Sequence, residues 1–383
     1  MIFCALSERK AFRPGCAALY KKFEFVDPSI KMDMNYCSAT NHLSFHSTDC
    51  SKKKTRALGL CSGGLDSILA GLVLRGQGID VVWISFETPF FEAEKARAAA
   101  AQTGIELIVK DITDRYLPML AAPPAGYGQF VNPCMDCHAL MFRIAGEMME
   151  ELGADFLFSG EVVGQRPMSQ VKPSLRYVEK HSGYDGYILR PLSAKNLPMT
   201  PMEEKGLVDR DQLCDFSGRS RKPQMALAKQ FGIADYPAPA GGCLLTDAGF
   251  AGRLKDLMAH RQKWLRRELD LLKYGRHLRL DAGTKLVVGR NKAENEQIAR
   301  LYDPEADTRI RMNQMAGPLG IIVEYTAGAC IRQAAAICAG YSKAAGDQPA
   351  EVEVTLPGED ARVISVVPVN PEIASQWMIL SCR

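Results

Sequence analysis

The chain has 383 residues, of which 47% are hydrophobic and 24% charged, and its formal net charge is +3 at pH 7. This length gives room for two or three domains, and so small a net charge does not by itself indicate nucleic-acid binding. No apolar run approaches the length of a membrane-spanning helix, so we expect no membrane partner. The 12 cysteines are spread along the chain without a secretory signal, which predicts a reducing cytoplasm rather than a disulfide scaffold.

Residues 1–55 differ from the rest of the chain. They contain four cysteines without metal-ligand spacing, show no clear periodicity, and end on a lysine run at 52–54. Two interpretations remain open: a functional tail whose lysines contact RNA, or an extension that follows from an upstream start codon, with Met32 or Met34 as the start. We expect the second, a disordered extension.

A glycine-rich loop follows the first predicted strand. An apolar run precedes Gly63 and Gly64, and a second apolar run after Ser67 favours a helix. A strand, a glycine turn and a helix start present backbone N–H groups to an anion. Ser62 and Ser67 add hydroxyl donors. We therefore predict a phosphate site here, and the alternative is a helix cap without a ligand.

The following elements alternate between strands and helices. Strands are predicted at 79–86, 105–110 and 154–158, with an alanine-rich helix at 92–102. This alternation predicts an α/β fold with a parallel sheet. Ligands in such sheets bind at the carboxyl ends of the strands, where the glycine loop and Phe86 fall.

Cysteines supply a second group of candidate residues. Cys134 and Cys137 form a C-x-x-C pair at the start of a predicted helix, whose N-terminus favours thiolates. The pair alone fits a redox site, half a zinc site or two packed thiols, and without a second pair a four-cysteine zinc site is not expected. Cys243 lies on a glycine- and proline-rich loop, where the backbone can approach a ligand.

The composition changes again toward the C-terminus. Apolar positions at 252–272 recur at helical spacing, and we take this stretch as one long linker helix. A hairpin with its turn at 281–284 and a helix beginning near Asn291 follow. We predict four segments in all: a disordered extension at 1–55, an ATP-binding domain at 56–250, a helical linker at 251–275 and a small α+β domain at 276–383.

The loop Ser62-Gly63-Gly64-Leu65-Asp66-Ser67 resembles the S-G-G-x-D-S signature of the PP-loop ATP pyrophosphatases. The resemblance implies a parallel sheet with helices on both faces, and cleavage of ATP between its α and β phosphates with Mg²⁺. It implies Asp66 as the partner of that metal. The ATP contacts that it implies are Ser62, Gly63, Gly64, Asp66, Ser67, Phe86 and Gly160.

Two further stretches resemble thiouridine-forming members of that family. Residues 159–170 resemble the T-G-E-x-x-G-Q-x-x-S-Q stretch of 4-thiouridine synthetases, with Ser159 for threonine and one extra residue before Ser169. Cys134 and Cys243 resemble the two cysteine loops of 2-thiouridine-forming enzymes. With Cys137 added, the set resembles that of thiolases which hold a [4Fe–4S] cluster by three thiolates. The resemblance implies these three ligands, or else a persulfide on Cys134 or Cys243 without a cluster.

The pattern V-G-R-N-x-x-x-N at 288–295 resembles the RNA-binding domain of NFACT proteins. It implies RNA contacts by Arg290, Asn291, Lys292 and Asn295. The alternative is an ordinary helix cap formed by Asn291. A basic run at 216–222 has two interpretations of the same kind, phosphate contacts or a solvated turn.

These resemblances imply an ATP-dependent tRNA sulfurtransferase. It would adenylate a uridine carbonyl and replace the oxygen with sulfur from sulfide or a sulfur-carrier protein. Two other functions remain open: a PP-loop ligase that acts on a small carboxylate, and a non-catalytic RNA-binding protein. Turnover of ATP to AMP, and its stimulation by tRNA or by a small acid, would separate the three.

Overall fold

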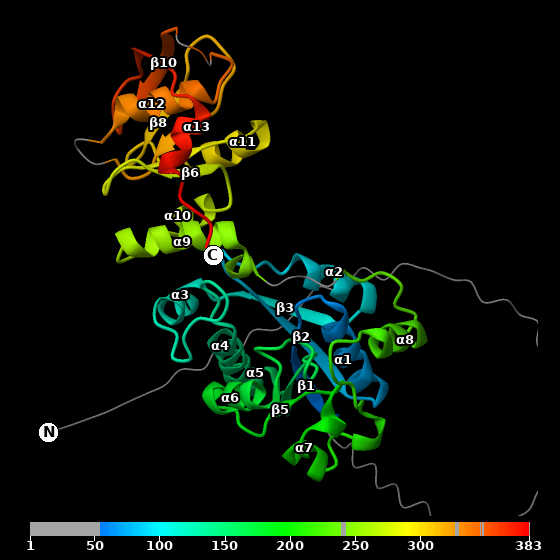
Figure 1. Cartoon of the computed structure of the whole chain (residues 1–383). Helices are drawn as coiled ribbons and strands as arrows, with labels where there is room; N and C mark the ends of the chain where they lie inside the picture. Colours follow the sequence, from blue (N-terminus) through cyan, green and yellow to red (C-terminus); the bar gives the residue numbers. More distant parts are fainter. Residues whose placement is uncertain (1–53, 239–242, 326–328, 345, 347, 383) are drawn as a thin grey trace, which may run out of the picture. The chain divides into compact units, whose positions relative to one another are not determined.

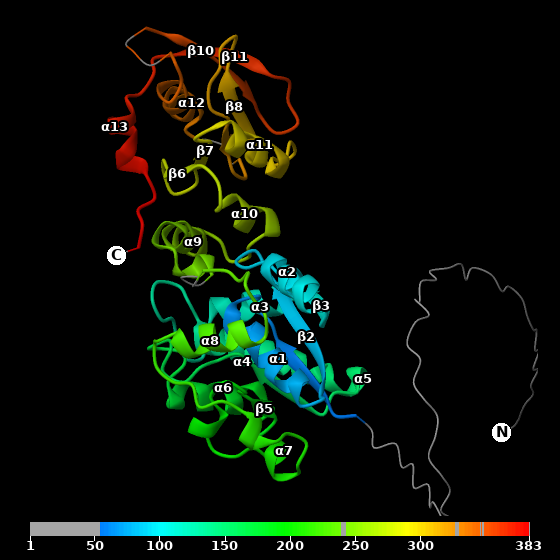
Figure 2. The same cartoon turned by 90° about the vertical axis from the view of Figure 1, so that its right-hand side faces the viewer.

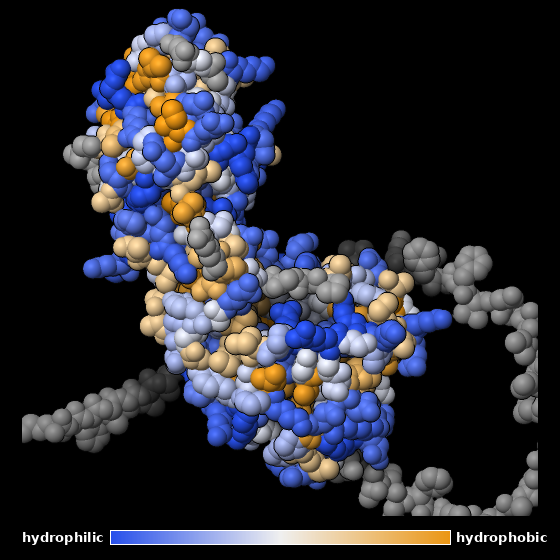
Figure 3. Space-filling model, in the orientation of Figure 1, coloured by the Kyte–Doolittle hydropathy of each residue, from blue (hydrophilic) through white to orange (hydrophobic). Residues whose placement is uncertain are grey.

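The computed structural model describes residues 54–238, 243–325, 329–344, 346 and 348–382. The extension predicted at 1–55 and its four cysteines therefore lie outside the described residues, apart from Lys54 and Thr55. Among the described residues, no helix is long and apolar enough to cross a membrane. On the face drawn in Figure 3, hydrophobic residues form small patches between hydrophilic ones.

The N-terminal half of the described chain contains a parallel sheet with the strand order β3-β2-β1-β4-β5 (Figure 1). Its strands are β1 (Arg56–Leu60), β2 (Asp80–Glu87), β3 (Glu106–Asp111), β4 (Phe156–Ser159) and β5 (Ile188–Leu189). Strand β1 pairs with β2 on one side and β4 on the other, so the glycine loop leaves the middle of the sheet. The predicted α/β fold with a parallel sheet is confirmed.

Helices cover both faces of this sheet. They are α1 (Leu65–Gly76), α2 (Glu94–Thr103), α3 (Thr113–Ala121), α4 (Cys134–Glu147), α5 (Met149–Leu152), α6 (Lys172–Ser182), α7 (Pro201–Glu204) and α8 (Lys222–Gln230). One core cluster packs α1, α2 and α8 on the sheet, and a second packs α3, α4 and α6 on the opposite face. Single 3-10 turns occur at Ala194–Asn196, Arg210–Gln212, Leu244–Thr246 and Ser375–Trp377.

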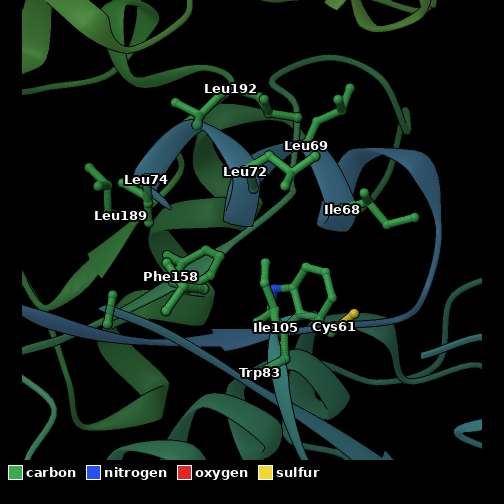
Figure 4. Close-up of a cluster of buried hydrophobic side chains, with 14 of the residues drawn as sticks. Cys61, Ile68, Leu69, Leu72, Leu74, Trp83, Ile105, Phe158, Leu189 and Leu192 are labelled. Carbon is green, nitrogen blue, oxygen red and sulfur yellow. The ribbon is translucent and has the colours of Figure 1, made fainter. Parts of the chain in front are cut away.

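The rings of Trp83 and Phe158 lie in the core beneath α1 (Figure 4), and each packs against a glycine. A Cβ on Gly59 would stand 2.1 Å from the ring of Phe158, and one on Gly71 would stand 2.8 Å from the indole of Trp83. Both rings are completely buried, and burial of a side chain of this size stabilises a fold by about 1.5–3 kcal/mol. The interlocking of these residues fixes α1, and with it the glycine loop, on the sheet.

The linker is not the single helix predicted from its apolar spacing. The chain forms α9 (Ala248–His260) and α10 (Arg266–Leu271), which residues 261–265 separate, with extended backbone at Arg261 and Leu265. The second helix has its own start, because the Leu265 N–H donates to the Glu268 carboxylate at 3.0 Å. Leu254, Leu257, Leu269 and Leu272 nevertheless belong to one core cluster, so the helical spacing of apolar residues continues across the break.

The C-terminal part contains an antiparallel sheet with the order β11-β10-β8-β9-β7-β6. Its strands are β6 (Arg276–Arg279), β7 (Lys285–Val288), β8 (Thr308–Met312), β9 (Gly320–Ile322), β10 (Ala350–Thr355) and β11 (Arg362–Val366). The helices are α11 (Lys292–Leu301), α12 (Ile331–Gly340) and α13 (Pro371–Ala374). Strands β6 and β7 form the predicted hairpin.

This second sheet is also covered on both faces. Leu286 and Val288 belong to the cluster that includes α12, which lies against the sheet in Figure 2. Val287, between them, belongs to the cluster formed with α10 and α11. Alternate residues of a strand point to opposite faces, so β7 is buried on both sides, as the smaller α+β fold requires.

Candidate active site

The glycine loop has one turn that only glycine can form and one side that no other described part of the protein covers. Gly63 has φ +69°, and a Cβ there would stand 2.1 Å from the carbonyl carbon of Lys95, so only glycine fits. Ser67 donates to the Gly64 carbonyl at 2.8 Å and holds the start of α1. Ser62 is exposed, and a Cβ on Gly64 would meet nothing nearer than the Ser62 hydroxyl, at 3.4 Å. Gly63 and Ser67 therefore shape the loop, while Ser62 and Gly64 face open space.

Asp66 lies half-buried in the first turn of α1. Its Oδ2 accepts a hydrogen bond from Nε2 of Gln165 at 3.1 Å, and its buried Oδ1 has no partner in the described part of the chain. Burial raises the pKa of Asp66, against the opposing effects of Gln165 and of the cations Arg221 and Arg166. An unpartnered carboxylate oxygen beside a phosphate-type loop suits a hard divalent cation.

Two side chains near the start of α8 also affect Asp66. Arg221 lowers the pKa of Asp66 through its charge, and the Gln224 amide lowers it from close range. Gln224 is fully buried, and its amide atoms form no hydrogen bond of good geometry among the described residues, nor does Nε of Arg221. Buried polar groups without partners are rare in folded proteins. Their concentration around the glycine loop therefore marks a ligand site.

Gly160 and Phe86 were predicted to contact ATP. A Cβ on Gly160 would stand 2.4 Å from the backbone carbonyl group of Asp66, so this glycine lets the end of β4 pack against the start of α1. Phe86 is 4% exposed and packs in the core. Their described contacts are therefore with protein, and direct contact with ATP stays a prediction for both.

Glu161 lies at the centre of a buried ionic network. Its carboxylate accepts from Nε of Arg190 at 3.0 Å and from Ser159 at 3.0 Å, and it contacts Nδ1 of His138 at 2.8 Å. Burial by itself would raise the pKa of Glu161, but Arg190 and His138 outweigh it and lower the pKa to about 2. Because His138 follows Cys137 by one residue on α4, the network joins the cysteine helix to the end of β4.

The three cysteines predicted to act together lie near one another. Cys137 and Cys243 belong to the same core cluster as Tyr116. The charge of a Cys134 thiolate would raise the pKa of Cys137, of Cys243 and of Tyr116. Burial raises the pKa of each thiol, and their mutual repulsion raises it further for Cys137 and Cys243. The prediction that the helix N-terminus would favour thiolates is therefore wrong for the free protein, since desolvation dominates.

The cysteine arrangement has two further features. Cys134 donates a hydrogen bond to Oδ1 of Asn132 at 3.0 Å. The exposed Arg166 opposes the effect of burial on Cys134 and Cys243, and it also acts on Asp66. Within the described ranges, no three or more Cys, His, Asp or Glu side chains stand in a metal-holding arrangement.

The remaining described cysteines are free thiols. Cys61 and Cys338 are buried, and burial raises the pKa of their thiols to about 11 and about 12. Cys214, Cys330 and Cys382 are only partly buried.

The predicted RNA contacts lie at the start of α11. Asn291 caps the helix by accepting from the Glu294 N–H at 3.0 Å, and Asn295 accepts from the Leu319 N–H at 3.1 Å. Arg290 forms an ion pair with Glu294. Lys292 is exposed. The structure thus gives Asn291 the capping role that the alternative proposed, and it gives Asn295 a contact within the fold that was not predicted. RNA contact by these four residues stays a prediction.

Comparison with sequence families identifies both parts. Residues 52–196 match the family described as thiamine biosynthesis protein (ThiI), and residues 275–378 match the NFACT protein RNA binding domain. The chain carries a ThiI-type PP-loop domain and an NFACT RNA-binding domain. Each match coincides with one of the two sheets described above.

Curated relatives of the chain are thiouridylases. The tRNA-specific 2-thiouridylase MnmA 3 of Bacteroides fragilis is 32% identical over 122 residues, which are 28% of this chain and 31% of that protein. The tRNA-specific 2-thiouridylase MnmA of Methylobacterium nodulans is 27% identical over 225 residues, 54% of this chain and 55% of that protein. The chain thus spans about a third to a half of the length of these relatives.

Similarity to solved structures is weak. A predicted subunit of tRNA methyltransferase from Methanocaldococcus jannaschii aligns with a TM-score of 0.31 and 14% identity, over 46% of this chain and 76% of that one. A likeness of this size adds nothing to the argument.

Sequence reasoning missed three features of the candidate site. Arg166 stands within the motif at 159–170 where the chain departs from the 4-thiouridine synthetase pattern, so nothing marked it. Arg221 lay inside a basic run that reads equally well as a solvated turn. The Glu161–Arg190 pair could have been suspected, because both residues follow strands that end at the same edge of the sheet.

Proposed function

We propose that this chain is an ATP-dependent tRNA sulfurtransferase that converts a uridine carbonyl into a thiocarbonyl. The observation that carries the proposal is that one exposed cation, Arg166, opposes the effect of burial on the pKa of Asp66, beside the phosphate loop, and on the pKa of the Cys134 and Cys243 thiols. A nucleotide site and a sulfur site that share one cation suit a reaction in which an adenylated intermediate meets a sulfur nucleophile.

In the first step, the uridine carbonyl oxygen forms a bond to the α-phosphorus of ATP, and the bond from that phosphorus to the bridging oxygen breaks. Pyrophosphate leaves. The open edge of the loop at Ser62 and Gly64 supplies space and donors for the phosphates. Asp66 would hold Mg²⁺ through its free Oδ1, and Mg²⁺ would neutralise charge on the departing pyrophosphate. Arg221, from the start of α8, adds positive charge on the same side.

In the second step, sulfide attacks the activated carbon, the carbon–oxygen bond breaks, and AMP leaves with the former carbonyl oxygen. Loss of the remaining sulfide proton leaves the thiocarbonyl. In this proposal Arg166 would hold the phosphate of the adenylated uridine, because a guanidinium binds phosphate through charge-assisted hydrogen bonds. No electron transfer is needed when sulfide is the donor.

Cys134, Cys137 and Cys243 supply the three sulfur donors that a [4Fe–4S] cluster takes when one iron stays open, and two of them, Cys137 and Cys243, belong to one core cluster. Bound there, the cluster would offer one open iron to an exogenous sulfide. The residues that surround the thiols limit access of water: Tyr116 is fully buried, and Cys137 is 9% exposed. The NFACT domain supports an RNA substrate, and the thiouridylase relatives support tRNA in particular.

The deciding experiment supplies the full-length protein, prepared without oxygen, with ATP, Mg²⁺, sulfide and unmodified tRNA. AMP and pyrophosphate are measured together with thionucleosides by mass spectrometry of digested tRNA. Equal amounts of AMP and thiouridine are expected. AMP formation that responds to small carboxylates and not to tRNA would favour a PP-loop ligase, and absence of ATP turnover under all conditions would favour a non-catalytic RNA-binding protein.

A further inference from the structure

A cavity of about 240 Å³ lies outside the candidate active site. It lies between helix α9, the start of strand β6, Arg290 just after strand β7, and the C-terminal segment at 378–381. Its lining residues are Gly249, Arg253, Gly275, Arg276, His277, Arg290, Met378, Ile379 and Ser381. Three arginines therefore converge on one hollow from three different segments of the chain.

Two of these arginines are held in place without a carboxylate partner. Arg253 donates from Nε to the Leu272 carbonyl at 2.8 Å, and the Arg276 guanidinium stacks on the ring of Tyr341 with 4.4 Å to its centroid. Neither forms an ion pair in the described part of the chain. Guanidinium groups fixed in this way lose little conformational entropy when a ligand binds them.

The charges around the hollow leave a surplus of positive charge. Burial lowers the pKa of Arg253, and Arg290 lowers it further, while Asp247 and Glu294 act in the opposite direction. Both carboxylates are already engaged: Asp247 caps α9 through the Phe250 N–H, and Glu294 holds Arg290 and its backbone N–H. An anion in the hollow would relieve the repulsion between Arg253 and Arg290.

The C-terminal segment builds one wall of the hollow. The Ile379 N–H donates to the His277 carbonyl at 2.9 Å, and the Cys382 N–H donates to the Ala248 carbonyl at 2.9 Å. A Cβ on Gly252 would stand 2.1 Å from the Leu380 carbonyl oxygen, so this glycine allows the segment to lie directly on α9. The wall is therefore fixed at both ends and is not a loose terminus.

We propose that this hollow binds a phosphate group of the RNA backbone, so that the bound RNA contacts both helix α9 and the NFACT domain. Arginine is the side chain best suited to a phosphate, because its donors form parallel hydrogen bonds to two oxygens. The site is more than a property of the NFACT domain, since Gly249, Arg253 and Ser381 lie outside its matched residues 275–378. The inference rests on the proposed RNA substrate and adds the place where the RNA is held.

The test uses full-length protein and fluorescently labelled tRNA, with affinity measured by anisotropy at several KCl concentrations. Arg276→Gln should weaken tRNA binding by roughly fivefold or more and make the slope of log affinity against log salt shallower by about one, because one phosphate contact is lost. Ser381→Glu, which leaves every arginine in place and adds a negative charge to an exposed position, should weaken binding similarly. The matched control is Arg362→Gln, an exposed arginine on β11 that changes the net charge equally.

Variant affinities and salt slopes equal to those of the control would overturn the proposal and leave an acidic protein as the occupant to consider. The affinity for ATP, measured by calorimetry in the absence of RNA, should be the same in all variants, because no residue of the phosphate loop lines the hollow. The two proposals fail separately. If the variants lose RNA affinity but the unaltered chain never thiolates tRNA, the proposed function is wrong and the phosphate site stands. If the chain thiolates tRNA fully but the variants keep their RNA affinity, the phosphate site is wrong and the proposed function stands.

Discussion

Gln165 donates a hydrogen bond from Nε2 to Oδ2 of Asp66 at 3.1 Å, although the two residues are 99 positions apart in the chain. The contact arises because β1 and β4 are parallel neighbours, so that the loops at their carboxyl ends meet. It fixes one carboxylate oxygen and leaves the other, Oδ1, buried without a partner among the described residues. Asp66 is thereby oriented with a free oxygen beside the phosphate loop.

This geometry makes Asp66→Asn an informative variant. The amide oxygen can still accept from Gln165, so the local structure should persist while the negative charge is lost. We expect ATP turnover to fall by at least about a hundredfold, as is typical when electrostatic stabilisation of a phosphoryl transition state is removed. Steady-state AMP formation against Mg²⁺ concentration checks this. Unchanged turnover with unchanged Mg²⁺ dependence would show that Asp66 does not hold the metal.

The phosphate loop itself can be tested at Gly64. The residue has φ −81°, and an added Cβ meets only the Ser62 hydroxyl at 3.4 Å, so Gly64→Val should fold normally. Its side chain would occupy the space above the loop, and ATP affinity should fall at least about tenfold, since close backbone approach to phosphate needs glycine. Gly76→Val at the far end of α1, where a Cβ meets nothing, is the control. Equal ATP affinities by calorimetry would remove the loop from the nucleotide site.

Glu161→Gln tests the buried ionic network through its pH dependence. The pKa of Glu161 is lowered from 4.5 to about 2 in the folded chain, so the ionised carboxylate stabilises the fold above pH 4.5 and this contribution is lost as the pH falls toward 2. The shift corresponds to about 3 kcal/mol. Urea unfolding at pH 7, 5 and 3 should show a large deficit for the variant at pH 7 that shrinks at pH 3. A deficit that is independent of pH would contradict the assigned ionisation.

Local patterns in the sequence were sufficient for the elements that carry the site. The glycine loop, the β6–β7 hairpin and the start of α11 are encoded by neighbouring residues, and all three form as predicted. Two predictions were wrong, the single linker helix and the favoured thiolates, and both errors arise from tertiary packing that local patterns do not show. The break between α9 and α10 depends on a cap by Glu268 that spacing alone does not show, and the raised thiol pKa values depend on burial by distant segments.

The sequence allowed prediction only of those site residues that lie within a short motif. Cys134, Cys137 and Cys243 do approach one another, although 106 residues separate Cys137 from Cys243 in the sequence. Arg166 and Arg221 could not be assigned to the site, because they come together only when the loop after β4 contacts the segment before α8. The Gly218 N–H donates a hydrogen bond to the Val163 carbonyl at 2.8 Å between these segments, and no local sequence pattern predicts it.

Arg166 should affect sulfur transfer more than nucleotide binding. We expect Arg166→Ala to reduce thiouridine formation by at least about tenfold, because the phosphate of the adenylated intermediate would lose a charge-assisted partner. ATP affinity should change less, since Arg221 and the loop remain. Arg219→Ala, an exposed arginine in the nearby basic run, serves as the control. The measurement compares thiouridine with AMP in one reaction, and a variant that makes both in the normal ratio and at the normal rate would show that Arg166 has no part in the transfer.

The last prediction concerns the three cysteines. Their thiols are raised in pKa by burial, and Cys137 and Cys243 also by neighbouring sulfur, so the free protein should hold them protonated at neutral pH. Only a cation can hold three thiolates together at such a place, because ligation and loss of the thiol protons are coupled. We therefore expect protein prepared without oxygen to be brown, with about one [4Fe–4S] cluster per chain by iron and sulfide assay.

Alanine at any one of Cys134, Cys137 or Cys243 should remove both the colour and the thiolation of tRNA, whereas Cys214→Ala should keep both, since that partly buried thiol does not act on the other three. Cys137 decides between the two sulfur chemistries. A persulfide needs at most a carrier and a resolving thiol, Cys134 and Cys243, and leaves Cys137 dispensable. A colourless anaerobic preparation that still thiolates tRNA, or a fully active Cys137→Ala variant, would exclude the cluster. Thiolation that then requires a sulfane-sulfur donor, such as the persulfide of a sulfur-carrier protein, would assign the chemistry to a persulfide on the Cys134–Cys243 pair.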